Sequence, residues 1–210
     1  MVGIEGIYVL TDNSFRERSH VDVARAALEG GARLIQLRDK HATTRHLVDC
    51  AKEIRALTQD ASSLFFINDR LDVALAVDAD GVHIGVDDMS LPLVRKLLGE
   101  SKIIGCSVAC ADEARVAEQT GADYVSVGSI FKTSTKLDAG APIGPGAIRA
   151  VKSAVMVPVV AIGGITKANV ASVFEAGADA ASLISAVADA DDMVAATSEL
   201  VKVWEANRNH

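Results

Sequence analysis

The sequence has few aromatic residues and no long apolar run, and each shortage excludes a class of protein. Aromatic residues make up 4% of the 210 residues, so the apolar half of the chain consists mainly of Ala, Val, Ile and Leu. Parallel strands buried beneath helices have this composition. The apolar stretches are far shorter than the roughly 20 residues of a membrane-spanning helix, so we expect no membrane association. The start, MVGIEGIYVLTD, lacks the basic residues of a signal peptide and predicts a first strand.

Cysteine and positive charge are also scarce. Cys50, Cys106 and Cys110 form an odd, sparse set, which is typical of a cytosolic protein with reduced thiols. No further cysteine or nearby histidine completes a metal site around Cys106 and Cys110, so we interpret them as ordinary thiols. The formal net charge is −7 and no basic run is present, so we expect no nucleic-acid partner. An anionic ligand would have to be held by local cations and backbone amides.

Short apolar runs alternate with longer stretches of helical spacing along the whole chain. The predicted strands are 7–12, 33–40, 63–69, 81–85, 102–108, 124–130, 157–164 and 180–186. The predicted helices are 20–30, 43–58, 70–78, 90–99, 111–120, 144–154, 167–176 and 189–206. Eight βα units of this length predict an α/β protein with a single domain over residues 1–210, a (β/α)8 TIM barrel. An open doubly wound sheet is the alternative, but no GxGxxG follows the first strand.

A barrel of this kind places its functional groups at the carboxyl ends of the strands. Polar residues or glycines stand at all eight predicted strand ends: Thr11 and Asp12; Gln36, Arg38 and Lys40; Asn68 and Asp69; His83, Asp87 and Asp88; Ser107; the loop FKTSTKLDAG; Gly163 and Gly164; and Ser185. Eight such ends in register predict a lined pocket.

Taken one by one, these groups also have structural interpretations. Charges at a strand exit are often solvated, and Asn or Asp there often forms a turn or a helix cap. We interpret His83, inside a strand, as a core or pocket-wall histidine with satisfied hydrogen bonds rather than a catalytic group. Asp78 and Asp80 flank a turn at the opposite face and are interpreted as structural.

Taken together, the groups sort by chemistry. Asp69 and Asp88, at the ends of neighbouring strands, suit Mg²⁺, which is often held by one or two carboxylates and substrate phosphate. Arg38, Lys40 and Lys136 suit a polyphosphate, and Gly164 and Ser185 suit a second phosphate. Gln36 and Asn68 suit the hydrogen-bonding edge of a heterocycle. The composite is a site for two phosphorylated small molecules and a magnesium ion.

With these residues in view, the sequence resembles the thiamine-phosphate synthase (thiamine-phosphate pyrophosphorylase) family. The resemblance spans nearly the whole chain and is carried by YVLTD, ALEGGARLIQLRDK, FINDRLDVALAVDADGVHIG, IIGCSV, ADYVSVGSIFKTSTK, VPVVAIGGI with Asn169, and AGADAASLISA. It implies a Mg²⁺-dependent transferase on a (β/α)8 barrel. Such an enzyme joins 4-amino-2-methyl-5-(diphosphooxymethyl)pyrimidine to 4-methyl-5-(2-phosphooxyethyl)thiazole, releasing pyrophosphate by a dissociative substitution.

The resemblance also implies roles for individual residues. Metal binding is implied for Asp69 and Asp88, and catalytic roles for Arg38, Lys40, Ser107 and Lys136. Substrate contacts are implied for Gln36, Leu37, Arg38, Asp39, Lys40, Asn68, Ser107, Thr133, Ser134, Thr135, Lys136, Gly164, Ile184 and Ser185.

Two positions depart from the family pattern. Ser129 stands where members usually have proline, and Val86-Asp87-Asp88 replaces a common Gln-Glu-Asp, where we assign the metal to Asp88. The alternatives are a thiazole tautomerase of the same superfamily, which tends to carry histidine at the place of Ser129, and a non-catalytic phosphate-binding barrel. A phosphosugar isomerase or aldolase would need an acid/base pair or a lysine inside a strand, and no predicted strand interior has a lysine. Whether the protein forms a homo-oligomer is left open.

Overall fold

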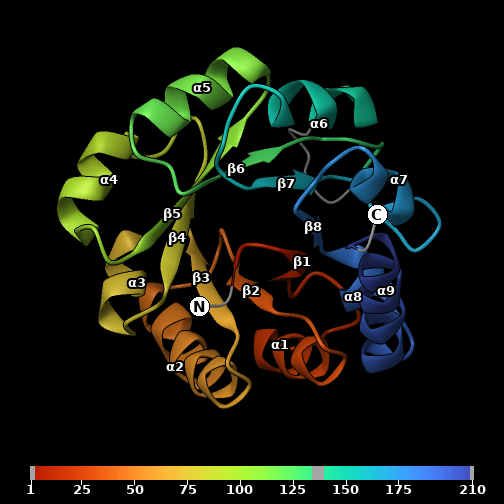
Figure 1. Cartoon of the computed structure of the whole chain (residues 1–210). Coiled ribbons are helices and arrows are strands. Elements are labelled where there is room, and N and C mark those ends of the chain that lie inside the picture. The colour runs from red at the N-terminus through yellow and green to blue at the C-terminus, as the bar shows by residue number, and fades with distance from the viewer. Residues whose placement is uncertain (1–2, 134–139, 209–210) are drawn as a thin grey trace.

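The protein is a closed barrel of eight parallel strands in sequence order, surrounded by a ring of helices (Figure 1). The computed structural model describes residues 3–133 and 140–208. Its strands are β1 (Gly6–Thr11), β2 (Leu34–Leu37), β3 (Leu64–Asn68), β4 (Gly81–Ile84), β5 (Ile103–Val108), β6 (Tyr124–Val127), β7 (Val159–Ile162) and β8 (Ala180–Leu183). The predicted (β/α)8 barrel is confirmed, although most strands are shorter than predicted and β2 ends at Leu37 rather than at residue 40.

The helices follow the strands in the predicted order. They are α1 (His20–Glu29), α2 (Thr44–Asp60), α3 (Leu71–Ala76), α4 (Leu91–Leu98), α5 (Ala111–Gln119), α6 (Pro145–Lys152), α7 (Val170–Glu175), α8 (Ser185–Ala188) and α9 (Met193–Arg208). The predicted helices do not include α8, a single turn directly after β8. Helix α9 packs beside α1 and so closes the ring between the two ends of the chain (Figure 1).

The strands are buried on both faces, so each contributes to two packed layers. Most buried apolar side chains lie between the strands and the helices, while a smaller cluster fills the barrel interior. Three rings form the centre of that inner cluster, with Phe66 5.5 Å from Tyr8 and 5.7 Å from Tyr124 between ring centroids. A Cβ on Gly105 of β5 would overlap the Tyr124 ring, so a glycine is required there. The rings form an aromatic floor below the carboxyl ends of the strands.

An aspartate directly before each of β4, β6 and β8 ties neighbouring units together. In all three cases Oδ2 accepts hydrogen bonds from the backbone N–H at the start of the preceding strand and from a basic side chain of a helix. The acceptors are Asp80, Asp123 and Asp179, with N–H donors Phe65, Ile104 and Val159 and basic donors Arg55, Arg95 and Lys152. The structural role predicted for Asp80 at the face opposite the site is therefore confirmed.

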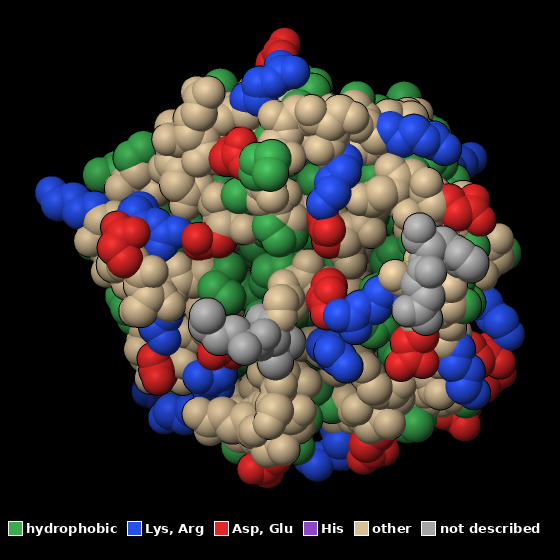
Figure 2. Space-filling model, in the orientation of Figure 1, with side chains coloured by type: hydrophobic (Ala, Val, Ile, Leu, Met, Phe, Trp, Pro, Cys, Tyr) green, Lys and Arg blue, Asp and Glu red, His purple; other side chains and the backbone are tan. Residues whose placement is uncertain are grey.

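The surface carries charges of both signs. Figure 2 shows acidic and basic side chains interspersed over the face seen in Figure 1. Among the residues that the structure describes, no helix is long and apolar enough to cross a membrane.

Candidate active site

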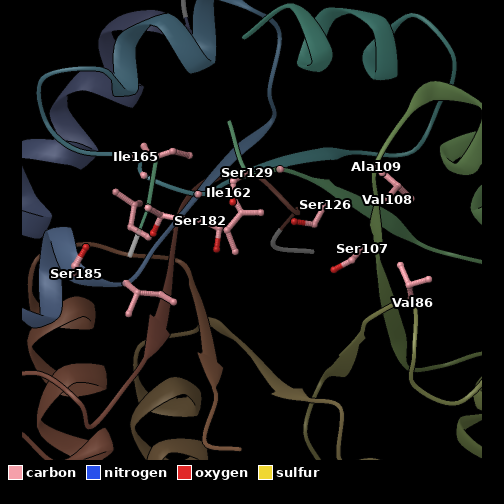
Figure 3. A pocket seen from close by; sticks show the side chains of 16 residues that line it. Val86, Ser107, Val108, Ala109, Ser126, Ser129, Ile162, Ile165, Ser182 and Ser185 are labelled. Carbon is pink, nitrogen blue, oxygen red and sulfur yellow. The ribbon is translucent and has the colours of Figure 1, made fainter. Parts of the chain in front are cut away.

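A cavity of about 210 Å³ opens at the carboxyl ends of β5 to β8. Hydroxyl groups and glycines alternate with aliphatic side chains in its wall, which consists of Val86, Ser107, Val108, Ala109, Ser126, Gly128, Ser129, Thr133, Ile162, Gly163, Gly164, Ile165, Ser182, Leu183, Ile184 and Ser185. Ser107 and Ser126 turn their hydroxyl oxygens toward the middle of this space (Figure 3). The cavity is therefore shaped for a partly apolar ligand with several polar atoms.

Five of the predicted substrate residues line this cavity, namely Ser107, Thr133, Gly164, Ile184 and Ser185. Sequence reasoning missed Ser126 and Ser182, because it took the middles of the strands to be apolar. Both are buried hydroxyls inside β6 and β8, and Ser182 Oγ has no hydrogen-bond partner within the described residues. A polar residue within an otherwise apolar strand was the available signal, since a buried polar group needs a partner.

The glycine pair after β7 is held in a conformation that favours glycine. Gly163 and Gly164 have φ of +102° and +63°, and a Cβ on Gly164 would overlap the carbonyl oxygen of Lys132. Asn169 fixes this turn, because its Nδ2 donates to the Gly164 carbonyl at 3.0 Å and its Oδ1 accepts from Thr166 N at 2.8 Å. The turn borders the cavity together with Ser185, so its backbone is available to a phosphate.

The acidic residues Asp69 and Asp88 come together at the ends of β3 and β4. Burial, followed by the hydrogen bond and charge of Asp88, raises the pKa of Asp69 to about 6. Lys40 and Arg38 lie near enough to offset part of this rise. Asp88 is oriented by its own backbone turn, where Gly85 N donates to Asp88 Oδ2 at 2.6 Å.

The surroundings of Asp69 show which of the predicted residues the structure brings together. Both Asp87 and Asp88 are exposed, but Asp88 is the carboxylate whose charge acts on Asp69. The structure also brings Arg38 and Lys40 near Asp69, although the strand that was predicted to carry them ends at Leu37. The Arg38 guanidinium is mostly buried and donates to Asp12 Oδ2 at 3.3 Å.

Two predicted substrate residues have side chains that point elsewhere. Leu37 is buried in the cluster between the barrel and its helices. Asp39 accepts hydrogen bonds from Asn13 Nδ2, His20 Nε2 and two backbone N–H groups, at 2.8–3.2 Å. Burial favours a higher pKa for Asp39, but the hydrogen bonds outweigh it and lower the pKa. Asp39 therefore anchors the segment that carries Arg38 and Lys40.

Polar residues also form a chain inside the barrel, on top of the aromatic floor. Gln36 Nε2 donates to the Tyr8 hydroxyl at 2.7 Å, and the hydroxyls of Tyr8 and Tyr124 lie 3.1 Å apart. His83 joins Tyr124 and Ser107, with each ring nitrogen 3.0 Å from a hydroxyl oxygen. The ring is buried and both of its nitrogens have hydrogen-bond partners, which confirms the prediction of a core or pocket-wall histidine with satisfied hydrogen bonds.

The remaining predicted residues divide into two groups. Asn68 ends β3 directly before Asp69 and is partly exposed. Ser134, Thr135 and Lys136 lie outside the described residues. Within the ranges 3–133 and 140–208, no group of three or more His, Cys, Asp or Glu residues could hold a metal ion, which leaves the pair of Asp69 and Asp88 as the predicted metal ligands.

A TIM barrel with an acidic pair, adjacent cations and a hydroxyl-lined cavity at its carboxyl face belongs to the class of barrels that bind phosphorylated small molecules. The family described as thiamine monophosphate synthase matches residues 7–187. A thiamine-phosphate synthase of Moorella thermoacetica is 53% identical over 171 residues, 81% of each chain. One of Methanosarcina barkeri is 52% identical over 173 residues, 82% of this chain and 78% of the relative. The chain belongs to the thiamine monophosphate synthase family, as its motifs predicted.

Solved structures agree with this assignment. Thiamine phosphate pyrophosphorylase from Pyrococcus furiosus superposes with a TM-score of 0.90 at 44% identity and covers 96% of both chains. A thiamine phosphate pyrophosphorylase from Bacteroides thetaiotaomicron has a TM-score of 0.69 at 16% identity, which supports the shared fold alone.

Proposed function

We propose that this site joins an aminopyrimidine methyl diphosphate to a thiazole ethyl phosphate and releases pyrophosphate, the thiamine-phosphate synthase reaction. The protein is a transferase of that family, and its relatives of about half identity carry the same name. The observation that carries the proposal is the pairing of Asp69 with Asp88 beside Arg38 and Lys40. The three free cysteines also support the cytosolic location that the sequence predicts.

The acidic pair fits a magnesium ion. Two carboxylates that share a hydrogen bond, with the pKa of one raised by the other, are a donor set suited to a cation. Mg²⁺ accepts such a pair together with water and phosphate oxygens. When bound, the ion would neutralise charge on the diphosphate. Asp69 and Asp88 would hold it, and the Gly85 N–H keeps Asp88 in place.

The cations of the chain would stabilise the departing diphosphate. In the dissociative reaction the bond between the pyrimidine methylene carbon and the diphosphate oxygen breaks, and its electron pair leaves with the diphosphate. Arg38, Lys40 and Lys136 would neutralise this developing charge, Arg38 as a two-pronged donor. The thiazole nitrogen then donates its lone pair to the methylene carbon, so no nucleophilic side chain is needed.

The second substrate would occupy the hydroxyl-lined cavity. The turn at Gly164 and the start of α8 at Ser185 would hold its phosphate through backbone N–H groups and the Ser185 hydroxyl. The aliphatic walls of Ile162 and Ile184 would pack against the thiazole ring. Leu37 and Asp39 would contribute to substrate binding through backbone atoms, because their side chains are engaged elsewhere.

The test is to incubate the protein with both phosphorylated substrates and Mg²⁺ and to measure thiamine phosphate and pyrophosphate. Asp69→Asn and Lys136→Ala are expected to lower turnover by about a hundredfold or more, because each removes charge stabilisation of the transition state. Asp87→Asn is the matched control, since this exposed carboxylate is adjacent to Asp88 in sequence, and it is expected to retain full turnover.

Equal formation of the two products supports the proposal. Conversion of the thiazole to its tautomer without thiamine phosphate would instead identify a tautomerase. Binding of both substrates without any reaction would identify a phosphate-binding barrel. Either result would overturn the proposed function.

A further inference from the structure

The chain of hydrogen bonds inside the barrel connects two parts of the proposed site. It begins at Gln36 on β2, passes through Tyr8 on β1 and Tyr124 on β6, and reaches His83 on β4 and then Ser107 on β5. The sequence predicts that Gln36 contacts the edge of a heterocycle, while Ser107 lines the cavity. Within the aromatic floor only Tyr8 and Tyr124 can extend the chain, because Phe66 has no hydroxyl.

The protons of this chain can be followed from one end. The Gln36 amide nitrogen is a donor only, so the Tyr8 oxygen accepts from it. Tyr8 then gives its single proton to the Tyr124 oxygen, and Tyr124 gives its own to His83 Nδ1. Burial raises the pKa of both tyrosines far above neutrality, so both keep the protons that this arrangement needs.

The last bond then has one direction only. If Nδ1 of His83 accepts, the neutral ring carries its proton on Nε2, which donates to Ser107 Oγ at 3.0 Å. The Ser107 oxygen is thereby used as an acceptor, and its proton is available to the cavity. If the Gln36 amide were turned over, its oxygen would accept from Tyr8 and every hydrogen bond of the chain would run in the opposite direction. Ser107 would then donate its proton to His83 and could only accept a hydrogen bond from the ligand.

The other end of the chain indicates what sets its direction. Gln36 Oε1 is buried and has no hydrogen-bond partner within the described residues. A ligand N–H at this oxygen would hold the amide in the orientation that donates to Tyr8. The unpartnered oxygen therefore makes the direction of the chain sensitive to the ligand at Gln36.

We propose that Tyr8, Tyr124 and His83 are positioning residues that couple ligand recognition at Gln36 to the proton direction at Ser107. A ligand that offers an N–H to Gln36 locks His83 as the Nε2–H tautomer and makes Ser107 a hydrogen-bond donor to the reacting substrates. The kinetic part of this inference rests on the proposed function, while the tautomer of His83 does not.

The first test is NMR of the histidine ring nitrogens in the protein saturated with 4-amino-5-hydroxymethyl-2-methylpyrimidine. This pyrimidine carries no diphosphate, so no reaction takes place during the measurement. His83→Gln assigns the signal by its loss. We expect a single His83 tautomer with its proton on Nε2. A proton on Nδ1 would overturn the inference, whether or not the protein is a synthase.

The second test is a double-mutant cycle on kcat/KM. Tyr124→Phe removes one hydroxyl and keeps the ring, so we expect about a tenfold loss, the effect of one hydrogen bond. Ser107→Ala is expected to cost about a hundredfold. If Tyr124 acts through Ser107, the double variant loses about a hundredfold, whereas independent effects would multiply to about a thousandfold and contradict the coupling.

Phe66→Leu is the control for a disturbance of the aromatic floor. It perturbs the same ring packing without touching the hydrogen-bond chain. Its effect is expected to multiply with that of Ser107→Ala. Coupling of equal size for Phe66 and Tyr124 would show that packing alone is responsible and would refute a positioning role.

Discussion

The acidic pair allows a prediction that needs no substrate: Asp69→Asn stabilises the metal-free protein at neutral pH. The pKa of Asp69 rises from 3.8 to about 6, through burial and then through Asp88. At about 1.36 kcal/mol per pKa unit, this corresponds to about 3 kcal/mol of destabilisation when the group is ionised. Asp69 is half-buried and solvent screens part of the repulsion, so we expect a gain of about 1–2 kcal/mol on substitution.

The gain has a defined pH dependence. Between pH 3.8 and about 6 the folded protein holds a proton on Asp69 that the unfolded chain releases, so wild-type stability falls as the pH rises through this window. The variant carries no such group. Its advantage should therefore be absent near pH 4, appear between pH 4 and 6, and be constant above pH 7.

Thermal unfolding in the presence of EDTA measures this difference. For a domain of this size 1 kcal/mol corresponds to about 2–4 °C, so Asp69→Asn should raise Tm by about 2–8 °C at pH 8. Added Mg²⁺ should raise the Tm of the wild type and leave that of the variant unchanged. Asp87→Asn, at an exposed carboxylate, is the control and should shift Tm by less than about 1 °C. A variant less stable than the wild type at pH 8, or a Tm difference independent of pH, would refute the reasoning.

Two further predictions concern the barrel interior. Gly105→Ala places a methyl group where the Tyr124 ring lies, so it should destabilise the protein by about 3 kcal/mol in urea unfolding. Gly146→Ala is the control, because it lies at an open position of α6 and should be neutral or stabilise the protein by about 0.5–1 kcal/mol. Equal effects of the two would contradict the packing. Ser182→Ala removes a buried hydroxyl that has no partner within the described residues, so it should stabilise the free protein by about 1 kcal/mol. Because Ser182 lines the cavity, the same variant should raise KM for the thiazole phosphate several-fold. Lower stability with an unchanged KM would instead show that Ser182 serves the fold.

The barrel was predictable because its signal is local and repeated. Each βα unit has its own apolar strand and amphipathic helix, so eight units could be counted without knowing any long-range contact. The length of β2 was less predictable. Residues 38–40 continue the alternation of the strand, but Asp39 is bound by His20 and by two backbone N–H groups, which bend this segment into a loop.

The strand-end part of the site was also predictable, because parallel strands in a barrel bring their carboxyl ends to one face whatever their separation in sequence. This rule brings Asp69 together with the aspartates after β4, while the choice of Asp88 over Asp87 rested on the family motif. The helical turn α8 was not predictable in the same way, since four residues are too few to show a helical period.

The interior hydrogen-bond chain lies beyond sequence reasoning for a physical reason. Tyr8 and Tyr124 are 116 residues apart, and an aromatic residue inside an apolar strand indicates core packing without indicating where its hydroxyl points. That direction is decided by the closure of the barrel, which turns Tyr8 and Tyr124 inward from β1 and β6, two strands that are not neighbours. Gly105 permits the contact only by leaving space for the Tyr124 ring, and a glycine in a strand can equally mark a bulge or a tight bend. The same geometry allows the chain to couple Gln36 to Ser107: in a closed barrel of this size, side chains from opposite strands meet at the axis, so a few hydrogen bonds span the whole site.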